Sequence, residues 1–338
     1  MNILFTCAGR RNYLINYFKE ALKGNGKVVA VDTQLSAPAM TDADVSIRVP
    51  SIYDETYIDA LKQVITNHNI DALISLNDLE LPILSKHKEK LEALNCKVII
   101  SDESVINIAF DKWETFKFFQ KLNIKTPNTF LTLEDALNAI NSKELCYPLV
   151  VKPRWGSASI GVDIVENENE LRLAYQLQHI RIKRSILNKA SQQEIDKSIL
   201  IQEKIGGEEY GIDILNDFNG NHYNSFVRKK LAMRSGETDK AISVTNSIFT
   251  NIGRVIGENT KHIGNMDCDF FVHNNDVYYL EMNPRFGGGY PFSHEAGINT
   301  PAIYLAWLAG IPNVDEFNDF KPDLMFSKCD RLIKVKNS

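Results

Sequence analysis

The first 110 residues of this chain alternate between short apolar stretches and longer amphipathic ones. The short stretches have the length of strands, and the longer ones carry apolar residues three and four positions apart, as helices do. Strands are predicted over residues 2–7, 27–31, 72–75 and 97–100. Helices are predicted over residues 12–23, 55–67 and 79–94. Strands that alternate with helices build a parallel sheet covered by helices, so we expect a Rossmann-like α/β domain here.

The character of the sequence changes after residue 111. An apolar stretch at 149–151 ends in Lys152, and a lysine at the end of a buried strand is costly unless it meets an anion. A loop of small residues follows at 156–161, and the exposed amides of such a loop can surround phosphate oxygens. The loop alone is equally consistent with a plain hairpin turn. Lys152, four residues before Gly156, favours the anion site.

A second informative run begins with a strand over residues 278–283 and continues through Arg285 to three consecutive glycines. Side chains two apart on a strand share a face, so Glu281 and Asn283 point to one spot while Met282 packs behind them. Oxygen ligands of this kind suit magnesium, and Arg285 could neutralise a phosphoryl group. The alternative is an edge strand whose polar side chains only face water.

Composition limits the classes of function. The chain has 338 residues, which suggests two to three domains. Its 44% of hydrophobic and 24% of charged residues are typical of a folded globular protein. A formal net charge of −5 argues against a broad phosphate-neutralising surface. We therefore expect no nucleic-acid partner and only a local anion site.

Cysteine usage and hydropathy predict the compartment. Five scattered cysteines fit neither a disulfide framework nor a zinc pattern, which favours buried thiols in a reducing environment. No stretch of about 18 apolar residues occurs in the sequence. The chain starts with a short strand in place of a basic region followed by a long apolar one. We expect a cytoplasmic protein without membrane contact.

The remaining segments complete the secondary-structure prediction. Residues 168–197 are polar and helix-prone, and their basic cluster is typical of a solvated face. Strands are predicted over residues 199–202 and 223–231, a flexible segment over 234–240, and helices over 247–259 and 301–309. No internal repeat is evident. The second half of the chain is therefore expected to mix α and β structure.

The order of these features is more specific than any one of them. In sequence order they are Asp111 with Lys112, Lys152, the loop 156–161, Glu203 with Ile205, Glu209, Asp269, Glu281, Asn283 and Arg285. On these residues the chain resembles the ATP-grasp superfamily. The resemblance is strongest to the short relatives of the carbamoyl phosphate synthetase large subunit, a group that includes the ligase of pyrrolysine biosynthesis. It covers essentially the whole chain.

The resemblance implies three parts. A preATP-grasp Rossmann-like domain would span residues 1–110, a central and lid subdomain 111–208, and a C-terminal subdomain with the metal site 209–338. ATP would be held between the last two. The lysines Lys112 and Lys152 would contact its phosphates as fixed positive charges. The remaining implied nucleotide contacts are Gly156, Ser157, Ala158, Ser159 and Gly161 in a mobile flap, Glu203, Lys204 and Ile205 at adenine, and Glu209 at the ribose.

The resemblance also implies a metal site and a reaction. Asp269, Glu281 and Asn283 would hold Mg²⁺ or Mn²⁺, with Asp267 as the alternative to Asp269. A small-molecule carboxylate would attack the γ-phosphorus of ATP, and an amine would then displace phosphate from the acyl phosphate to form an amide. Such catalysis consists mainly of positioning and charge neutralisation.

Catalysis is assigned to Arg285 and Lys152, with backbone amides of 287–289 holding the acyl-phosphate oxygen. For the second substrate we name Arg234, Gly287, Gly288 and His294. For Arg234 and His294 we favour the alternative, a surface or helix-cap role.

Three other interpretations remain at this point. Carbamoyl phosphate synthetase-like activation of bicarbonate and ammonia is one, but that enzyme resembles two fused ATP-grasp halves and this chain has one. A non-catalytic nucleotide-binding protein would lose the metal ligands, whereas Glu281 and Asn283 are present. An NAD-type oxidoreductase requires a glycine triplet after the first strand, and Gly9 stands alone there. Any oligomer is expected to be a symmetric homodimer.

Overall fold

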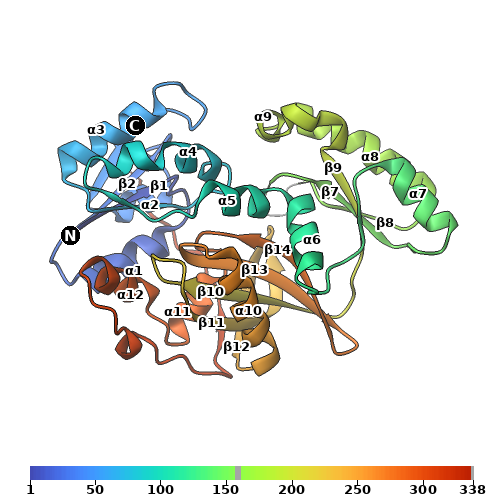
Figure 1. Ribbon diagram of the computed structural model, residues 1–338. Coiled ribbons are helices and arrows are strands. Elements are labelled where there is room, and N and C mark those ends of the chain that lie inside the picture. Colours follow the sequence, from blue (N-terminus) through green and yellow to red (C-terminus); the bar gives the residue numbers. More distant parts are fainter. Residues whose placement is uncertain (157–160, 336–338) are drawn as a thin grey trace.

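The computed structural model describes residues 1–156 and 161–335. Its N-terminal part, blue in Figure 1, is a parallel sheet of five strands. The strand order is β3-β2-β1-β4-β5. The strands are β1 (Asn2–Thr6), β2 (Lys27–Asp32), β3 (Val45–Arg48), β4 (Ala72–Ser75) and β5 (Lys97–Val98). The helices are α1 (Asn12–Leu22), α2 (Pro38–Asp42), α3 (Tyr57–His68), α4 (Leu81–Glu92) and α5 (Glu103–Phe110). The predicted α/β class is confirmed. The sequence pattern misses β3 and α2, which are too short to show a period, and it also misses α5.

Both faces of this sheet are buried, which explains why its strands are almost continuously apolar. On one face Phe5 packs against Phe18 of α1, and on the other Leu4 packs in a cluster that contains Leu61 of α3. The loops that follow β1 and β4 lie at the carboxyl ends of the strands. Open α/β sheets place their functional residues at this edge.

The middle of the chain forms a smaller α/β layer, seen in green at one side of Figure 1. Four strands pair in the order β6-β9-β7-β8, and all three pairings are antiparallel. The strands are β6 (Thr129–Phe130), β7 (Leu149–Pro153), β8 (Asp163–Val165) and β9 (Ile199–Glu203). The helices of this layer are α7 (Leu133–Asn141), α8 (Glu168–Lys183), α9 (Leu187–Ser191) and the 3-10 helix η1 (Gln192–Lys197), whereas the preceding helix α6 (Lys112–Lys121) packs on the next sheet. The predicted polar excursion over 168–197 is therefore helical.

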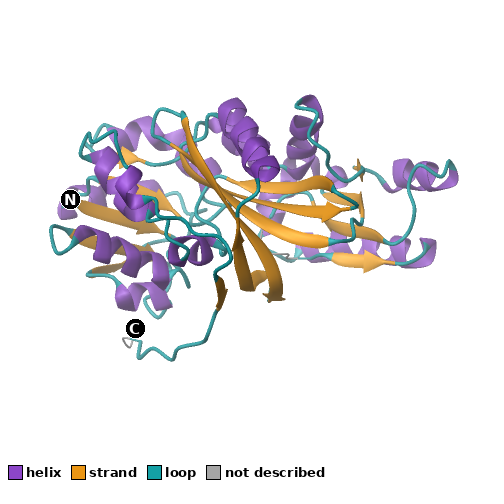
Figure 2. Ribbon diagram, turned by 90° about the horizontal axis from the view of Figure 1, so that it is seen from below, coloured by secondary structure: helices purple, strands orange, loops and turns teal. Residues whose placement is uncertain are grey.

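The largest sheet follows, and its long twisted strands cross the centre of the molecule (Figure 2). Its order is β14-β13-β10-β11-β12-β15, with antiparallel pairing throughout. The strands are β10 (Glu208–Asn216), β11 (His222–Arg234), β12 (Glu237–Val244), β13 (Gly264–His273), β14 (Asp276–Asn283) and β15 (Met325–Ser327). Helix α10 (Ser247–Thr260) covers one face of it with Phe249 and Ile256.

One prediction is wrong in this sheet. Residues 234–240 are predicted to be flexible, but they form the turn and the first half of β12. Arg234 pairs with Glu237, which leaves Ser235 and Gly236 as a two-residue turn with φ of 51° and 78°. Positive φ at both central residues is what a tight hairpin between twisted strands requires. The polar composition therefore marks a hairpin turn.

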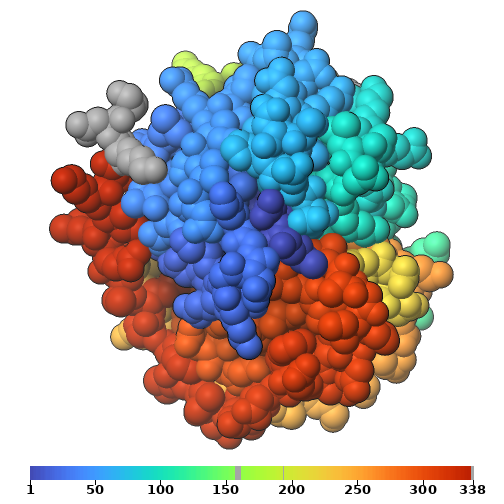
Figure 3. Space-filling model, turned by 90° about the vertical axis from the view of Figure 1, so that its left-hand side faces the viewer, coloured from blue at the N-terminus to red at the C-terminus, as the bar shows by residue number. Residues whose placement is uncertain are grey.

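The C-terminal segment returns to the N-terminal domain. It contains α11 (Tyr290–Glu295), α12 (Thr300–Leu308) and η2 (Asp315–Phe317). Phe18 of α1 contacts both Phe286 and Tyr304 with ring centroids 6.3 and 6.2 Å apart. In Figure 3 the two ends of the sequence, blue and red, accordingly lie against each other. Within the described residues, no helix has the length and apolarity needed to cross a bilayer.

Candidate active site

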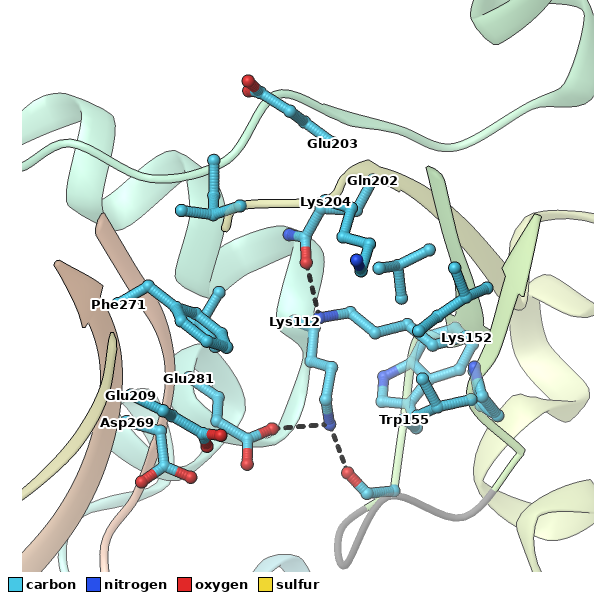
Figure 4. Close-up of a pocket in the computed structure, with 17 residues that line it drawn as sticks. Lys112, Lys152, Trp155, Gln202, Glu203, Lys204, Glu209, Asp269, Phe271 and Glu281 are labelled. Carbon is cyan, nitrogen blue, oxygen red and sulfur yellow. Dashed lines mark hydrogen bonds and ion pairs between the residues drawn. The ribbon is translucent and has the colours of Figure 1, made fainter. Parts of the chain in front are cut away.

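A cavity of about 270 Å³ lies between the four-stranded and the six-stranded sheet (Figure 4), and we call it the nucleotide cavity. Apolar side chains from both sheets line it, including Val150 and Ile164 on one side and Phe271 and Leu280 on the other. Nine residues that the sequence predicts for ATP or metal binding also line it, namely Lys112, Lys152, Gly156, Glu203, Lys204, Ile205, Glu209, Asp269 and Glu281. An apolar cavity with a few converging charges is the usual form of a ligand site.

Two lysines from different elements meet in this cavity. Lys112 is the first residue of α6, where the preceding Asp111 caps the helix and is held by Arg154 at 2.6 and 2.8 Å. The Lys112 ammonium group lies 3.5 Å from Glu281 and also donates to the Gly156 carbonyl oxygen. Lys152, on β7, donates to Gln202 Oε1 at 2.7 Å. The ion pair between Asp111 and Arg154 thus fixes the start of α6 beside the end of β7.

The electrostatics of Lys152 differ from those of a surface lysine. Burial and the nearby charge of Lys112 lower the pKa of Lys152 to about 8, against a smaller opposite effect of Glu281. A lysine with this pKa remains mostly protonated at neutral pH, and the nearby carboxylate of Glu281 offsets its positive charge only in part. It is therefore prepared to bind an anion.

The opposite side of the cavity is acidic. Strand pairing places Asp269 across from Glu281 and Asp267 across from Asn283. Met282 is fully buried behind them, as the strand pattern predicts. Burial raises the pKa of Asp269 to about 7, although the ammonium group of Lys230, 2.7 Å away, opposes the shift. For Glu281 burial also acts upward, but the charges of Lys112 and Lys152 prevail and lower its pKa.

The acidic group fits a hard divalent cation. Two carboxylates and one amide oxygen lie on adjacent, paired strands, and magnesium takes its remaining ligands from phosphate and water. In the part of the chain that the structure describes, no three His, Cys, Asp or Glu side chains form a complete metal site by themselves. Asp267 is already engaged by the buried guanidinium group of Arg228, which also binds Asp213 at 2.6 Å. Asp269 is also paired, with Lys230, but it lines the nucleotide cavity and Asp267 does not, so Asp269 remains our proposed ligand.

The glycine loop packs on this buried ion pair. A Cβ atom on Gly287 would lie 2.1 Å from Asp267 Cγ, and one on Gly289 would lie 2.1 Å from Arg228 Nε. Side chains are excluded at both positions by this close packing, which is a sufficient reason for glycine. Just before the loop, Arg285 binds Asp78 of the N-terminal domain at 2.5 Å.

A second cavity of about 140 Å³ adjoins the first, and we call it the acceptor cavity. It shares Glu209, Asp269 and Glu281 with the nucleotide cavity. Its other charged lining residues are Arg11 and Asp78 from the N-terminal domain, Arg228 and Lys230 from β11, Glu237 from β12, and Asp267 and Arg285. The two cavities therefore meet at the acidic group.

Some predicted site residues lie elsewhere. Arg234 lines neither cavity, because it extends toward solvent and pairs with Asp330 at 2.6 Å and Asp239 at 3.1 Å. His294 stacks on Tyr17, with ring centroids 3.6 Å apart, and also lies outside both. The side chain of Glu203 points away from the lysines in Figure 4 and accepts a hydrogen bond from the Asn128 amide at 3.2 Å.

The small-residue loop lies only partly within the described residues. Gly156 lines the nucleotide cavity, whereas Gly161 packs beside Pro153 with a φ of 72° and lines neither of the two cavities. The predicted contacts Ser157, Ala158 and Ser159 lie outside the described residues. Of the two glycines predicted for the second substrate, Gly288 lines the acceptor cavity and Gly287 lines neither cavity.

The sequence prediction misses several residues of the site. Lys230 is 4% exposed and its ammonium group lies 2.8 Å from Glu209 and 2.7 Å from Asp269. Only a weak signal for it exists: Arg228 and Lys230 are two apart on one strand and so share a face, but Lys229 between them hides the alternation. Arg11 has only a weak signal, because it follows β1 at the start of a helix, where an anion could bind. Asp78 has none, since it follows β4 as an ordinary loop residue.

Together, two antiparallel sheets that hold a cavity between lysines and paired acids define a nucleotide-binding clamp of the ATP-grasp class. Comparison with known families agrees. Residues 145–291 match the family described as the ATP-grasp domain, and residues 3–99 match the PylC-like, N-terminal domain. Over these two stretches the chain matches an ATP-grasp domain that follows a PylC-like N-terminal domain.

Known proteins resemble the chain over most of its length. The carbamoyl phosphate synthase large chain of Campylobacter jejuni is 25% identical over 82% of this chain, which spans 26% of that protein. The formate-dependent phosphoribosylglycinamide formyltransferase of Prochlorococcus marinus is 24% identical over 79% of this chain and 65% of its own. The biotin carboxylase domain of Hydrogenobacter thermophilus 2-oxoglutarate carboxylase, solved with MgADP, gives a TM-score of 0.71 at 17% identity, covering 94% of this chain and 72% of that chain. The likeness to the solved structure concerns the fold.

Proposed function

We propose that the protein is an ATP-dependent ligase that joins a small-molecule carboxylate to an amine. The observation that carries this proposal is the junction of the two cavities at Glu209, Asp269 and Glu281. A nucleotide in one cavity would present its terminal phosphate to a molecule in the other across a shared acidic group. Direct transfer between two bound substrates needs such an arrangement.

ATP is the proposed occupant of the nucleotide cavity. The apolar side chains would hold the adenine ring, with the backbone at Lys204 and Ile205 reading its edge, and Glu209 would bind the ribose. Lys112 and Lys152 would neutralise the phosphates. Asp269, Glu281 and Asn283 would hold Mg²⁺ or Mn²⁺, which supplies charge neutralisation for the transferred phosphoryl group.

The chain's own residues would then serve two steps. In the first, the substrate carboxylate oxygen bonds to the γ-phosphorus and the bond to ADP breaks, while Arg285 and Lys152 balance the negative charge on the phosphoryl group. In the second, the amine nitrogen bonds to the acyl carbon and phosphate leaves, with the released proton passing to solvent. Backbone amides of residues 287–289 would stabilise the oxygen that becomes negative in this step.

The proposal is tested by ADP formation from Mg·ATP with individual carboxylic acids, with hydroxylamine added to trap acyl phosphates as hydroxamates. ADP and hydroxamate that both depend on one acid support the ligase. ATP binding without ADP formation from any acid would favour a nucleotide-binding protein. ADP formation that depends on bicarbonate and ammonia would favour the carbamoyl phosphate reaction.

Glu281 supplies the matching mutational prediction. Glu281→Gln keeps the size of the side chain but removes the charge that the proposed metal needs, so turnover should fall by about 10²-fold or more. Glu258→Gln on α10, whose side chain pairs with Arg254 on the exposed face, is the control and should keep full activity. Circular dichroism should be unchanged in both variants. Near-normal turnover of Glu281→Gln would contradict the metal assignment.

The quaternary structure is a separate proposal. The Hydrogenobacter thermophilus domain is described as a dimer, and closed two-fold pairing is the commonest state of soluble oligomers. We propose a symmetric homodimer for this chain as well. Sedimentation equilibrium would decide it, and a mass of one chain at all concentrations would argue against it.

A further inference from the structure

Arg11 and Glu237 line the outer end of the acceptor cavity, and Lys328, which lies beside the cavity and does not line it, pairs with the same Glu237. Arg11 follows β1, Glu237 begins β12, and Lys328 follows β15. One guanidinium nitrogen of Arg11 lies 3.5 Å from Glu237 Oε1, and the ammonium nitrogen of Lys328 lies 3.3 Å from Glu237 Oε2. Since one carboxylate cannot neutralise two cations, one positive charge remains at this end.

The inner end of the same cavity has the opposite balance. Lys230 lies between two acids, Glu209 and Asp269, and Arg228 lies between Asp213 and Asp267. Each of these cations is therefore outnumbered by its carboxylates. A surplus of negative charge suits the proposed metal, which brings positive charge of its own. Charge thus changes from negative to positive along the cavity, from the phosphoryl-transfer end outward.

The outer cations are accessible to a ligand. The side chains of Arg11 and Lys328 are 18% and 23% exposed, so neither is sealed inside the protein. A guanidinium group has five N–H donors, and the contacts of Arg11 in the described chain are with Glu237 and, at 2.7 Å, with the Tyr13 hydroxyl group. Gly288 lies between the charges, where a Cβ atom would be 3.0 Å from Arg11 and 3.1 Å from Glu237.

A purely structural role would not need this surplus. Arg11 with Glu237 alone would tie the N-terminal domain to β12 as a neutral pair. Lys328 adds a second tie, to the Gly288 carbonyl oxygen at 2.9 Å, but it adds a charge as well. Arg10, exposed nearby, raises the positive charge further. Positive charge concentrated at a cavity mouth attracts and orients anions.

We propose that the carboxylate substrate carries a second anionic group, which binds Arg11 and Lys328 while its first carboxylate is phosphorylated at the inner end. This rests on the proposed ligase function and narrows its substrate class to small dianionic acids. The second group can be a carboxylate or a phosphate, because a guanidinium group binds both in the same forked geometry.

Binding measured without turnover tests this class directly. Calorimetric titration with Mg²⁺ and a non-hydrolysable ATP analogue present would compare glutarate with pentanoate and 3-phosphoglycerate with glycerate. At least one dianion should bind tenfold more tightly than its monoanionic counterpart. Lys328→Met and Arg11→Gln should each remove most of that advantage. Lys321→Met is the matched control, because this exposed lysine in the same C-terminal segment pairs only with Asp319 in the described chain.

Three outcomes would overturn the proposal: equal binding of dianions and monoanions, no measurable binding of either dianion, or a binding preference for the dianion that survives both Lys328→Met and Arg11→Gln. The hydroxylamine assay separates this proposal from the ligase itself. A dianion preference without any ADP formation would leave the anion site standing and refute the ligase. Turnover of monoanions and dianions with equal kcat/KM would support the ligase and refute the anion site.

Discussion

At the scale of the single residue, Lys152 is expected to couple ATP binding to the uptake of a proton. Its pKa is about 8 in the free protein, below the ordinary value for lysine of about 10.4. The phosphates of ATP favour the charged form and raise that pKa. At pH 7 the lysine is already mostly protonated, so binding takes up little. At pH 9 it is mostly neutral beforehand, and binding should take up close to one proton.

Calorimetry of ATP binding in buffers of different ionisation enthalpy would measure this uptake. In Lys152→Arg the guanidinium group stays charged at every accessible pH, so ATP should still bind while the uptake at pH 9 disappears. Equal uptake in the wild type and in Lys152→Arg would contradict the assignment of the proton to Lys152.

The residues of the site divide by how far a strand pattern can reach. Glu281 and Asn283 are predictable because the period of two of a strand assigns them to one face. Lys152 is predictable because a lysine at the end of a buried apolar strand is costly without an anion. Arg11 and Asp78 are not, because nothing in a loop sequence tells which distant strand it will meet. The prediction for Arg234 is not met for a related reason: beside its tight turn, Arg234 pairs with nearby acids, Asp239 and Asp330, in place of a substrate.

At the scale of the element, the glycine loop depends on the buried pair beneath it. Gly289 has an ordinary φ of −85°, so alanine there meets no backbone strain. Its methyl group would overlap Arg228 instead. We expect Gly289→Ala to cost about 1–3 kcal/mol of unfolding free energy, as overpacking of a filled interior does.

Urea unfolding would measure that cost. Gly206→Ala is the control, because its Cβ atom would meet the His273 ring at an ordinary 3.6 Å. A loss of the same size in both variants would mean that the overlap with Arg228 is not the cause.

Elements were predictable in proportion to their length and periodicity. The helices α1, α3 and α10 and the strand β14 follow their patterns to within two residues. The hairpin at 234–240 was mistaken for a flexible segment because its turn residues are polar, although a serine and a glycine between two alternating stretches favour a tight turn.

At the scale of the whole molecule, the N-terminal domain and the C-terminal subdomain share one core. Phe18 is fully buried and joins them through Phe286 and Tyr304. Phe18→Ala should cost about 3–5 kcal/mol of unfolding free energy. Because Phe286 adjoins the glycine loop, the variant should also raise KM for the carboxylate substrate.

Leu61→Ala provides the comparison, since Leu61 lies in the cluster on the other face of the same sheet, away from the loop. It should lower stability by about 2–5 kcal/mol and leave KM unchanged. Equal effects of the two variants on KM would argue that the shared core does not position the loop.

The boundary between the two cavities has a consequence for how such enzymes diverge. Glu209, Asp269 and Glu281 belong to both cavities, so a substitution there that suits a new acid also disturbs the nucleotide. Changes in substrate choice are therefore restricted to positions that line the acceptor cavity and not the nucleotide cavity, such as Arg11, Asp78 and Glu237. Two of these three come from the N-terminal domain, of which no described residue lines the nucleotide cavity, so a relative can acquire a new substrate by changing that domain alone.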